Sequence, residues 1–394
     1  MGLKQRGKKS KDMKVNKEAP APSSPLGGEV KSSSLTLSRQ TVLLLCLIGF
    51  FSLYIFMKSY SAQRKAAQEA SEMPLDTDVF ISSFPKCGSF WGRFLIASVY
   101  GIVARDSTSR VTFDTIETLI PDLELGENRR DFAKHEQLFP GLRLFKSHQS
   151  YQSDPISPSE KSGLFKNLPS CAEKVGEGME YSQCYCPNCP AKFKKTVLIV
   201  RDGRSALCSY YKFQSSLNNF EGTFSKFLRD AEASHYGKSW SGWYGSWVNA
   251  SVTKDVNFVG SSYSKFKRIT KGGGEGGGVD VYVLRYEDLK SNAVEALRGV
   301  MEFLGPETLP ALTKKVLQRA VDDNDFENMK RKELRDGGGK HFKKHYPDAV
   351  SNGFGIVRQG ESKGYSECFG EEDEAYFLDE LGGGDVMREF GYNF

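Results

Sequence analysis

Beyond its first 65 residues the sequence lacks a surplus of basic residues. The 394-residue chain has a formal net charge of +5, but residues 1–40 carry +6 and residues 41–65 carry +3, which leaves −4 for residues 66–394. A nucleic-acid-binding domain needs a basic folded surface, so this charge pattern argues against nucleic acid as a partner. The sequence also lacks internal repeats. Its glycine-rich insertion near 271–278 does not join a strand to a helix, which argues against a phosphate-binding loop there.

Residues 41–57 (TVLLLCLIGFFSLYIFM) form a charge-free apolar run. A membrane-spanning helix needs about 17–25 such residues, and the basic residues before the run predict that the N-terminal side faces the cytosol. A cleaved signal peptide is one alternative, but its basic region would be unusually long and no A-x-A cleavage site follows. A buried core helix is the other, but the flanks of the run are polar and the run has no amphipathic period. We therefore predict a disordered cytosolic tail (1–40), a transmembrane anchor (41–57), a luminal stem (58–76) and a folded luminal domain (77–394).

Four of the eight cysteines cluster at 171–189. In the lumen such a cluster is expected to form disulfides, for which four cysteines allow three connectivities. The CPNC sequence at 186–189 resembles half of a zinc site, but the spacing of the four cysteines fits no common zinc module. We predict disulfides here. The glycosylation sequon Asn249-Ala250-Ser251 supports a luminal position.

Three apolar runs are typical of strands buried on both faces: Asp78–Phe84, Thr196–Val200 and Val279–Arg285. Each run leads into a turn and then into a stretch with helical spacing. This alternation predicts an α/β domain with a P-loop-like parallel sheet flanked by helices. Ligands of such sheets bind at the carboxyl ends of the strands, so the residues that follow the strands are the candidates for a site.

Helical spacing is clearest after the first and third strands. The apolar residues between Phe90 and Ile102 cover most of a helix circumference, which predicts a buried helix. After the third strand, an apolar stripe is ended by Gly305, and Asn292 with Glu295 matches a capping box. The stripe consists of Val294, Leu297, Met301 and Leu304.

The first strand–turn–helix segment reads SSFPKCGSFWGRFL and places Lys86 and Gly88 between a buried strand and a helix N-terminus. Backbone N–H groups and the helix dipole there attract an anion. It is not a Walker A loop, because the lysine precedes the glycine and the metal-binding hydroxyl is missing. An ordinary turn with a solvated lysine is the alternative.

Two further segments carry polar groups suited to the same edge of the sheet. Arg201 ends the second strand and Ser209 follows in the next helix, although Arg201 taken alone could form a surface ion pair with Asp202. The segment LRLFKSH, if extended, presents Lys146 and His148 on one face. An imidazole titrates near neutral pH and suits a general base.

These segments, in this order, resemble the superfamily of sulfotransferases that use 3'-phosphoadenosine-5'-phosphosulfate (PAPS). SFPKCGSFW resembles its phosphosulfate loop T-Y-P-K-S-G-T-T-W, RDGRSALCSYYKF resembles its 3'-phosphate motif, and Lys146-Ser147-His148 resembles its catalytic K-T-H. Downstream, LRYEDLK, DFENMK and Arg358-Gln359-Gly360 resemble the family's Y-E-D-L-K, S-F-x-x-M-K and R-K-G. The resemblance spans residues 76–394.

The resemblance implies a sulfotransferase that uses PAPS, releases PAP and requires no metal. It implies that His148 is the general base, that Lys86 stabilises the leaving oxygen and that Lys146 supports the sulfuryl oxygens. An anchored luminal member is expected in the Golgi membrane as a single-pass type II protein that acts on a glycan, a glycolipid or a secreted protein. The implied cofactor-binding residues are Lys86, Cys87, Gly88, Ser89, Phe90, Trp91, Arg201, Ser209, Tyr286, Phe326, Arg358, Gln359 and Gly360.

Three residues depart from the family pattern: Cys87 replaces a serine, Phe90 a threonine and Gln359 a lysine. They leave open a catalytically degenerate membrane protein that only binds ligands. A luminal P-loop kinase is a further alternative, against which the order of Lys86 and Gly88 argues. A Golgi glycosyltransferase would use a D-x-D motif, but residues 76–78 (DTD) precede the first strand and are poorly placed for it.

Overall fold

The computed structural model describes residues 40, 57–58, 78–105, 111–122, 142–151, 193–252, 256–259, 278–305, 312–336, 338, 343, 347–351, 355–357 and 364–394. The chain divides into two compact units, residues 1–65 and 66–394. The predicted cysteine cluster, and nearly all of the predicted tail, anchor, stem and glycine-rich insertion, lie outside the described residues. Among the residues that are described, no helix is both long and apolar enough to cross a membrane.

The second unit is built on a parallel five-stranded sheet in the order β2-β1-β3-β5-β4. The three predicted strands are confirmed as β1, β3 and β5, and the segment LRLFKSH forms the edge strand β2. The fourth strand was not predicted, because the four-residue run VNFV is too short to stand out in the sequence. The strands are β1 (Asp78–Ser82), β2 (Arg143–Ser147), β3 (Lys195–Val200), β4 (Val256–Val259) and β5 (Val279–Arg285).

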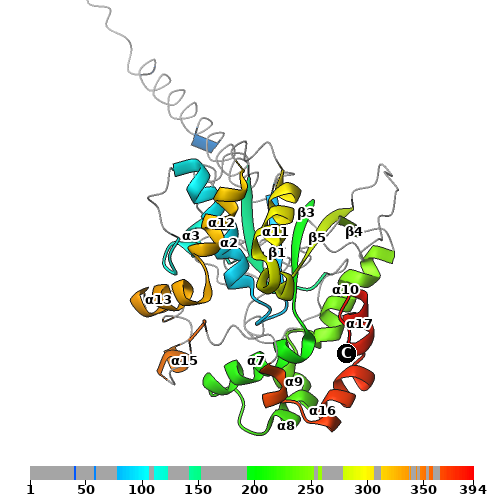
Figure 1. Ribbon diagram of the computed structural model, residues 1–394. Helices are drawn as coiled ribbons and strands as arrows, with labels where there is room; N and C mark the ends of the chain where they lie inside the picture. The colour runs from blue at the N-terminus through cyan, green and yellow to red at the C-terminus, as the bar shows by residue number, and fades with distance from the viewer. Residues whose placement is uncertain are drawn as a thin grey trace, which may run out of the picture. The chain divides into compact units, whose positions relative to one another are not determined.

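Helices cover both faces of this sheet (Figure 1). On the first face lie α2 (Ser89–Arg105), α3 (Ile116–Leu119), α11 (Tyr286–Leu304), α12 (Lys314–Asp322) and α13 (Phe326–Asp336). Helices that pack on the second face or continue from it are α7 (Gly203–Ser216), α8 (Phe224–Arg229), α9 (Ala231–Ser234), α10 (Trp240–Val252) and α17 (Gly383–Glu389). The remaining short elements are α15 (Pro347–Ser351), the 3-10 helix η6 (Gly364–Glu367), α16 (Glu371–Ala375) and the π-helix η7 (Tyr376–Glu380).

The two faces of the sheet bury separate apolar clusters because successive strand side chains point to opposite sides. In β3, Val197 and Ile199 pack with α2 and α11, whereas Leu198 and Val200 pack with α7 and α10. All four side chains are fully buried. The apolar run that looked continuous in the sequence therefore serves two cores, as expected for a strand covered on both sides.

Helix α11 starts earlier than its capping signal predicts. It begins at Tyr286, directly after β5, and is kinked at Asn292, which has non-helical dihedral angles. The side chain of Asn292 accepts a hydrogen bond from the backbone N–H of Glu295 at 3.4 Å, so the predicted cap serves the second half of a kinked helix. Gly305 ends the helix as predicted.

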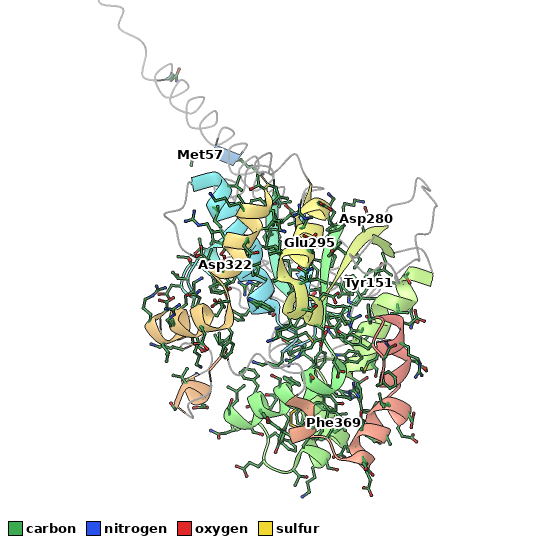
Figure 2. The ribbon with its side chains drawn as sticks, viewed as in Figure 1. Met57, Tyr151, Asp280, Glu295, Asp322 and Phe369 are labelled. Carbon is green, nitrogen blue, oxygen red and sulfur yellow. A yellow bond between two sulfur atoms is a disulfide. The ribbon has the colours of Figure 1, made fainter. Side chains whose placement is uncertain are left out.

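A disulfide that the sequence analysis did not predict joins Cys208 of α7 to Cys368, across 160 residues of sequence. It fastens the C-terminal segment to the second face of the sheet. Phe369, the next residue (Figure 2), packs against Phe224 of α8 with ring centroids 4.6 Å apart and ring planes tilted by 58°. The link therefore lies beside an aromatic cluster, with Cys208 buried and Cys368 half-buried.

Candidate functional site

The turn between β1 and α2 has the form expected of an anion-binding loop. Lys86 and Gly88 both have positive φ angles, of 66° and 93°, and α2 starts at the next residue, Ser89. A lysine in the left-handed region costs about 1–2 kcal/mol, and such strain persists where the surrounding structure enforces it, often at functional sites. The turn thereby aims the N-terminus of a 17-residue helix at the edge of the sheet.

Gly88 lets this turn approach the end of β5 closely. A Cβ atom at Gly88 would lie 2.5 Å from Cδ2 of Tyr286, so no larger residue fits without displacing that ring. Tyr286 also packs edge-on against Trp91, with ring centroids 5.8 Å apart. The indole N–H of Trp91 donates to the carbonyl of Asn324 at 2.8 Å. Two of the three aromatic residues predicted to flank the adenine are thus in contact with each other.

Arg201 joins the end of β3 to the same turn. Its guanidinium donates to the carbonyl oxygen of Lys86 at 3.0 Å and lies 4.7 Å above the ring of Tyr286. Asp202 does not serve as the ion-pair partner considered for Arg201. Its carboxylate caps α7 and binds Arg204 at 2.6 Å. The structure therefore holds Arg201 at the carboxyl edge of the sheet, beside the turn.

Helix α7 contributes a contact that the sequence analysis missed. The ammonium of Lys86 lies 4.7 Å from the ring centroid of Phe213. Phe213 is one helical turn beyond Ser209, the half-buried serine predicted to bind a 3'-phosphate. The backbone of Lys86 is thus held by Arg201 and its side chain by Phe213, and both come from the β3–α7 unit.

His148 follows β2 at the same edge and is anchored on the turn. Its Nδ1 lies 2.7 Å from the carbonyl oxygen of Ser83. A carbonyl oxygen only accepts hydrogen bonds, so Nδ1 carries the hydrogen and Nε2 carries the lone pair. The ring also meets Tyr236 edge-on at 5.7 Å, and the indole of Trp243 donates to the backbone carbonyl of His148 at 2.8 Å.

The charge state of His148 is set by its surroundings. Burial lowers its pKa from 6.5 to about 3, and the positive charges of Lys146 and Lys86 act in the same direction, against the carboxylate of Asp122. The imidazole is therefore neutral at physiological pH. A neutral imidazole with its lone pair on Nε2 is the form that a general base requires.

Lys146 is buried and its ammonium forms an ion pair with Asp122 at 2.6 Å. Burial raises the pKa of Asp122, but the charges of Lys146 and Arg93 outweigh it and leave that pKa below its ordinary value. Asp122 was not among the predicted residues, because it lies 24 positions before its partner, in a segment without a periodic pattern.

The other predicted residues of the turn divide into buried and half-buried positions. Burial raises the pKa of the Cys87 thiol to about 12, and this side chain is fully enclosed next to Tyr244. Ser89 is buried at the first position of α2. Phe90 is half-buried and stacks on Phe113 with centroids 5.9 Å apart. The side chains that replace a serine and a threonine of the family motif thus take part in packing.

The remaining predictions concern the periphery of the site. Phe326, the third aromatic residue predicted to flank the adenine, starts α13 and is 37% exposed. Arg358, Gln359 and Gly360 lie outside the described residues. Asp78, which ends the D-x-D sequence, is buried in β1 and bound by Arg143 at 2.5 and 2.6 Å. That carboxylate neutralises an arginine, which argues further against the glycosyltransferase alternative.

Comparison with known proteins points to one family. The sulfotransferase domain family matches residues 188–373, which include Arg201 and Ser209 but not Lys86 or His148. Cytosolic sulfotransferase 6 of Arabidopsis thaliana is 25% identical over 240 residues, or 59% of this chain and 56% of the relative. Sulfotransferase 6B1 of Pan troglodytes is 22% identical over 299 residues, or 74% and 76%. The chain thus spans less than two thirds of the Arabidopsis relative.

Two solved structures are similar at low identity. Retinol dehydratase, in complex with androsterone and the inactive cofactor PAP, is 15% identical with a TM-score of 0.45, over 82% of this chain and 84% of that one. Mouse sulfotransferase SULT7A1, complexed with PAP, is 17% identical with a TM-score of 0.42, over 80% and 86%. The domain match and the sequence relatives support a place for this chain in the sulfotransferase superfamily.

Proposed function

We propose that this protein transfers a sulfuryl group from PAPS to a hydroxyl group of its acceptor, with His148 as the general base. The observation that carries the proposal is the 2.7 Å contact between Nδ1 of His148 and the carbonyl of Ser83. It fixes the tautomer whose Nε2 can take a proton. The same contact ties the base to the turn that carries Lys86, so the base and the anion-binding loop form one unit.

The groups at this edge suit a polyanionic nucleotide. An ammonium, a guanidinium and a long helix N-terminus converge there, and Gly88 leaves room for the ring of Tyr286 beside the turn. PAPS, when bound, supplies the activated sulfuryl group. Residues of the turn from Lys86 to Ser89 would hold its phosphosulfate. Arg201, Ser209, Arg358, Gln359 and Gly360 would hold the 3'-phosphate, and Trp91, Tyr286 and Phe326 would flank the adenine.

Within this assignment the residues have distinct tasks. His148 accepts the proton of the acceptor hydroxyl at Nε2, while its Nδ1–H stays on the carbonyl of Ser83. The Lys86 ammonium places positive charge where negative charge develops on the leaving oxygen. Arg201 keeps the backbone of Lys86 in its strained conformation. Cys87 is buried and Phe90 packs on Phe113, so backbone N–H groups of the turn would take the place of the side-chain hydroxyls of the family motif.

We further propose that the protein is a Golgi enzyme, anchored as a single-pass type II membrane protein, whose acceptor is a glycan, a glycolipid or a secreted protein. The apolar run at 41–57 supports the anchor. The disulfide between Cys208 and Cys368 suits an oxidising compartment. Asn249 of the sequon is exposed on α10, where it is accessible to glycosylation. Sensitivity of the expressed protein to an N-glycosidase, lost in Asn249→Gln, tests the luminal orientation.

The catalytic assignment is tested with the purified full chain and radiolabelled PAPS. Wild type is expected to label a mixture of secretory-pathway glycans and to be stabilised against heat by PAP. His148→Ala should keep the stabilisation by PAP and lose turnover by at least about a hundredfold. His235→Ala, which changes the other histidine that the structure describes, is the matched control and should retain turnover.

Each alternative gives a different result. Stabilisation by PAP without turnover in wild type would favour the ligand-binding alternative. Stabilisation only by ATP with Mg²⁺ would favour a kinase. Retained turnover in His148→Ala would remove this residue as the base.

A further inference from the structure

A buried ion pair lies next to the base and has no role in the mechanism described above. The side chains of Lys146 and Asp122 are 4% and 7% exposed and their charged atoms are 2.6 Å apart. The two residues also form an isolated parallel bridge, and the backbone N–H of Lys146 donates to the carbonyl of Pro121 at 2.9 Å. Backbone and side-chain bonds thus attach the short segment at Pro121 and Asp122 to the outer edge of β2.

A second buried pair supports the same segment from α2. Arg93, which is fully buried, contacts the carboxylate of Glu117 at 3.0 Å and donates to the carbonyl of Ile120. The carboxylate of Glu117 in turn accepts the backbone N–H of Asp122 at 3.3 Å. The position of the Asp122 carboxylate is therefore set from two sides, by α2 and by β2.

The pair acts on His148, which is two residues beyond Lys146. The charged and titratable groups that face His148 come from three elements: Lys146 from β2, Asp122 from the segment beside it, and Lys86 from the β1–α2 turn. Tyr236, after α9, contributes an aromatic ring. Two of the three charges are positive, so the carboxylate of Asp122 is the group that offsets them.

We propose that Asp122 is a positioning residue of the transfer reaction: its carboxylate holds the Lys146 ammonium in a neutral buried pair and keeps that charge off the base. This inference rests on the proposed function. It gives Lys146 a different task from the one that the family resemblance implies, because the ammonium then serves the Asp122 carboxylate, 2.6 Å away, rather than a sulfuryl group.

The two tasks differ in how substitutions combine. If the pair acts as a unit, Asp122→Asn leaves an uncompensated cation beside His148 and weakens the base. The added positive charge does not impair the binding of an anionic donor. The double variant Asp122→Asn/Lys146→Met removes both charges and restores the balance. If the ammonium instead contacts the transferred group, Lys146→Met abolishes turnover and the double variant stays inactive.

The experiment measures kcat and the KM for PAPS in wild type, both single variants and the double variant. Active protein is counted by PAP binding. Asp122→Asn is expected to lower kcat roughly tenfold without raising the donor KM, and the double variant is expected to recover most of the loss. Asp78→Asn is the matched control, because it removes a buried carboxylate from an equally close pair at the opposite end of β2. It should lower stability and leave kcat per active molecule unchanged.

A second readout does not depend on turnover. The full chain contains five histidines, so ¹³C-labelled histidine allows His148 to be titrated by NMR, with His148→Gln for assignment. The pKa of His148 should rise in Lys146→Met and rise less in the double variant. An inactive double variant, or a kcat in Asp122→Asn no lower than in Asp78→Asn, would overturn the proposal. If wild type shows no turnover with PAPS, the proposed function fails, and an unchanged pKa in Lys146→Met would overturn this inference as well.

Discussion

Replacing Gly88 with alanine should damage both stability and donor binding. The new Cβ would lie 2.5 Å from Cδ2 of Tyr286, whereas carbon atoms in contact are about 3.5–4.0 Å apart. The ring must therefore retreat by roughly 1 Å. It is buried, packs against Trp91 and lies beneath the guanidinium of Arg201, so its displacement disturbs both neighbours.

The expected loss combines two effects. A positive φ of 93° at a non-glycine residue costs about 1–2 kcal/mol, and overpacking of a buried ring costs about 1–3 kcal/mol. We expect a total near 3 kcal/mol, which lowers Tm by roughly 4 °C in a domain of this size. Because Arg201 moves with Tyr286, PAP should bind roughly tenfold more weakly.

Gly382→Ala separates the two effects. Gly382 has a φ of 65° and no atom within 4 Å of its added Cβ, so this variant reports the backbone cost without a clash. It should lose about 1 kcal/mol and bind PAP as wild type does. Thermal unfolding of both variants with and without PAP is the assay. Equal losses in the two variants, or unchanged PAP affinity in Gly88→Ala, would refute the role assigned to the contact with Tyr286.

Two further predictions concern His148 and the disulfide. The pKa of His148 falls from 6.5 in the unfolded chain to about 3 in the folded protein, so as the pH drops the unfolded chain takes up the proton before the folded protein does. The contribution of His148 to the unfolding free energy is therefore fully present above pH 6.5 and is lost as the pH drops towards 3. His148→Gln should flatten this part of the curve of unfolding free energy against pH, and an unaltered curve would contradict the assigned environment. Removing the Cys208–Cys368 link, which spans 160 residues, with Cys368→Ser should cost up to about 5 kcal/mol. Dithiothreitol should lower the Tm of wild type by more than that of the variant, in which only the disulfides predicted at 171–189 remain to be reduced.

The sequence was informative where a local pattern carried the structure. The three apolar runs became β1, β3 and β5, because a strand buried on both faces needs only apolar residues in succession. The turn at Lys86 was also predictable, since a glycine and a lysine between a strand and a helix already imply the geometry that attracts an anion. The structure places Arg201 beside that turn, as its position at the end of the neighbouring strand had suggested.

The contacts that complete the site could not be predicted from local patterns. Asp122 reaches Lys146 across 24 residues, and Phe213 reaches Lys86 from a different βα unit. Neither Asp122 nor Phe213 stands out from the sequence around it, and only the order of the strands in the sheet brings the two residues to the site. The partners Cys208 and Cys368 were hidden for the same reason, because the clustered cysteines at 171–189 gave the stronger signal.

The left-handed backbone conformation of Lys86 implies a conflict between thermal stability and function at this turn. A glycine at this position would relieve about 1 kcal/mol of conformational strain, so a chain selected only for resistance to heat would not keep a lysine here. The strain is sustained by the bond from Arg201 to the carbonyl of Lys86. Substitutions that raise thermal stability should therefore be sought outside residues 83–88. Within this turn, a glycine in place of Lys86 would relieve the strain but would also remove the positive charge of the lysine.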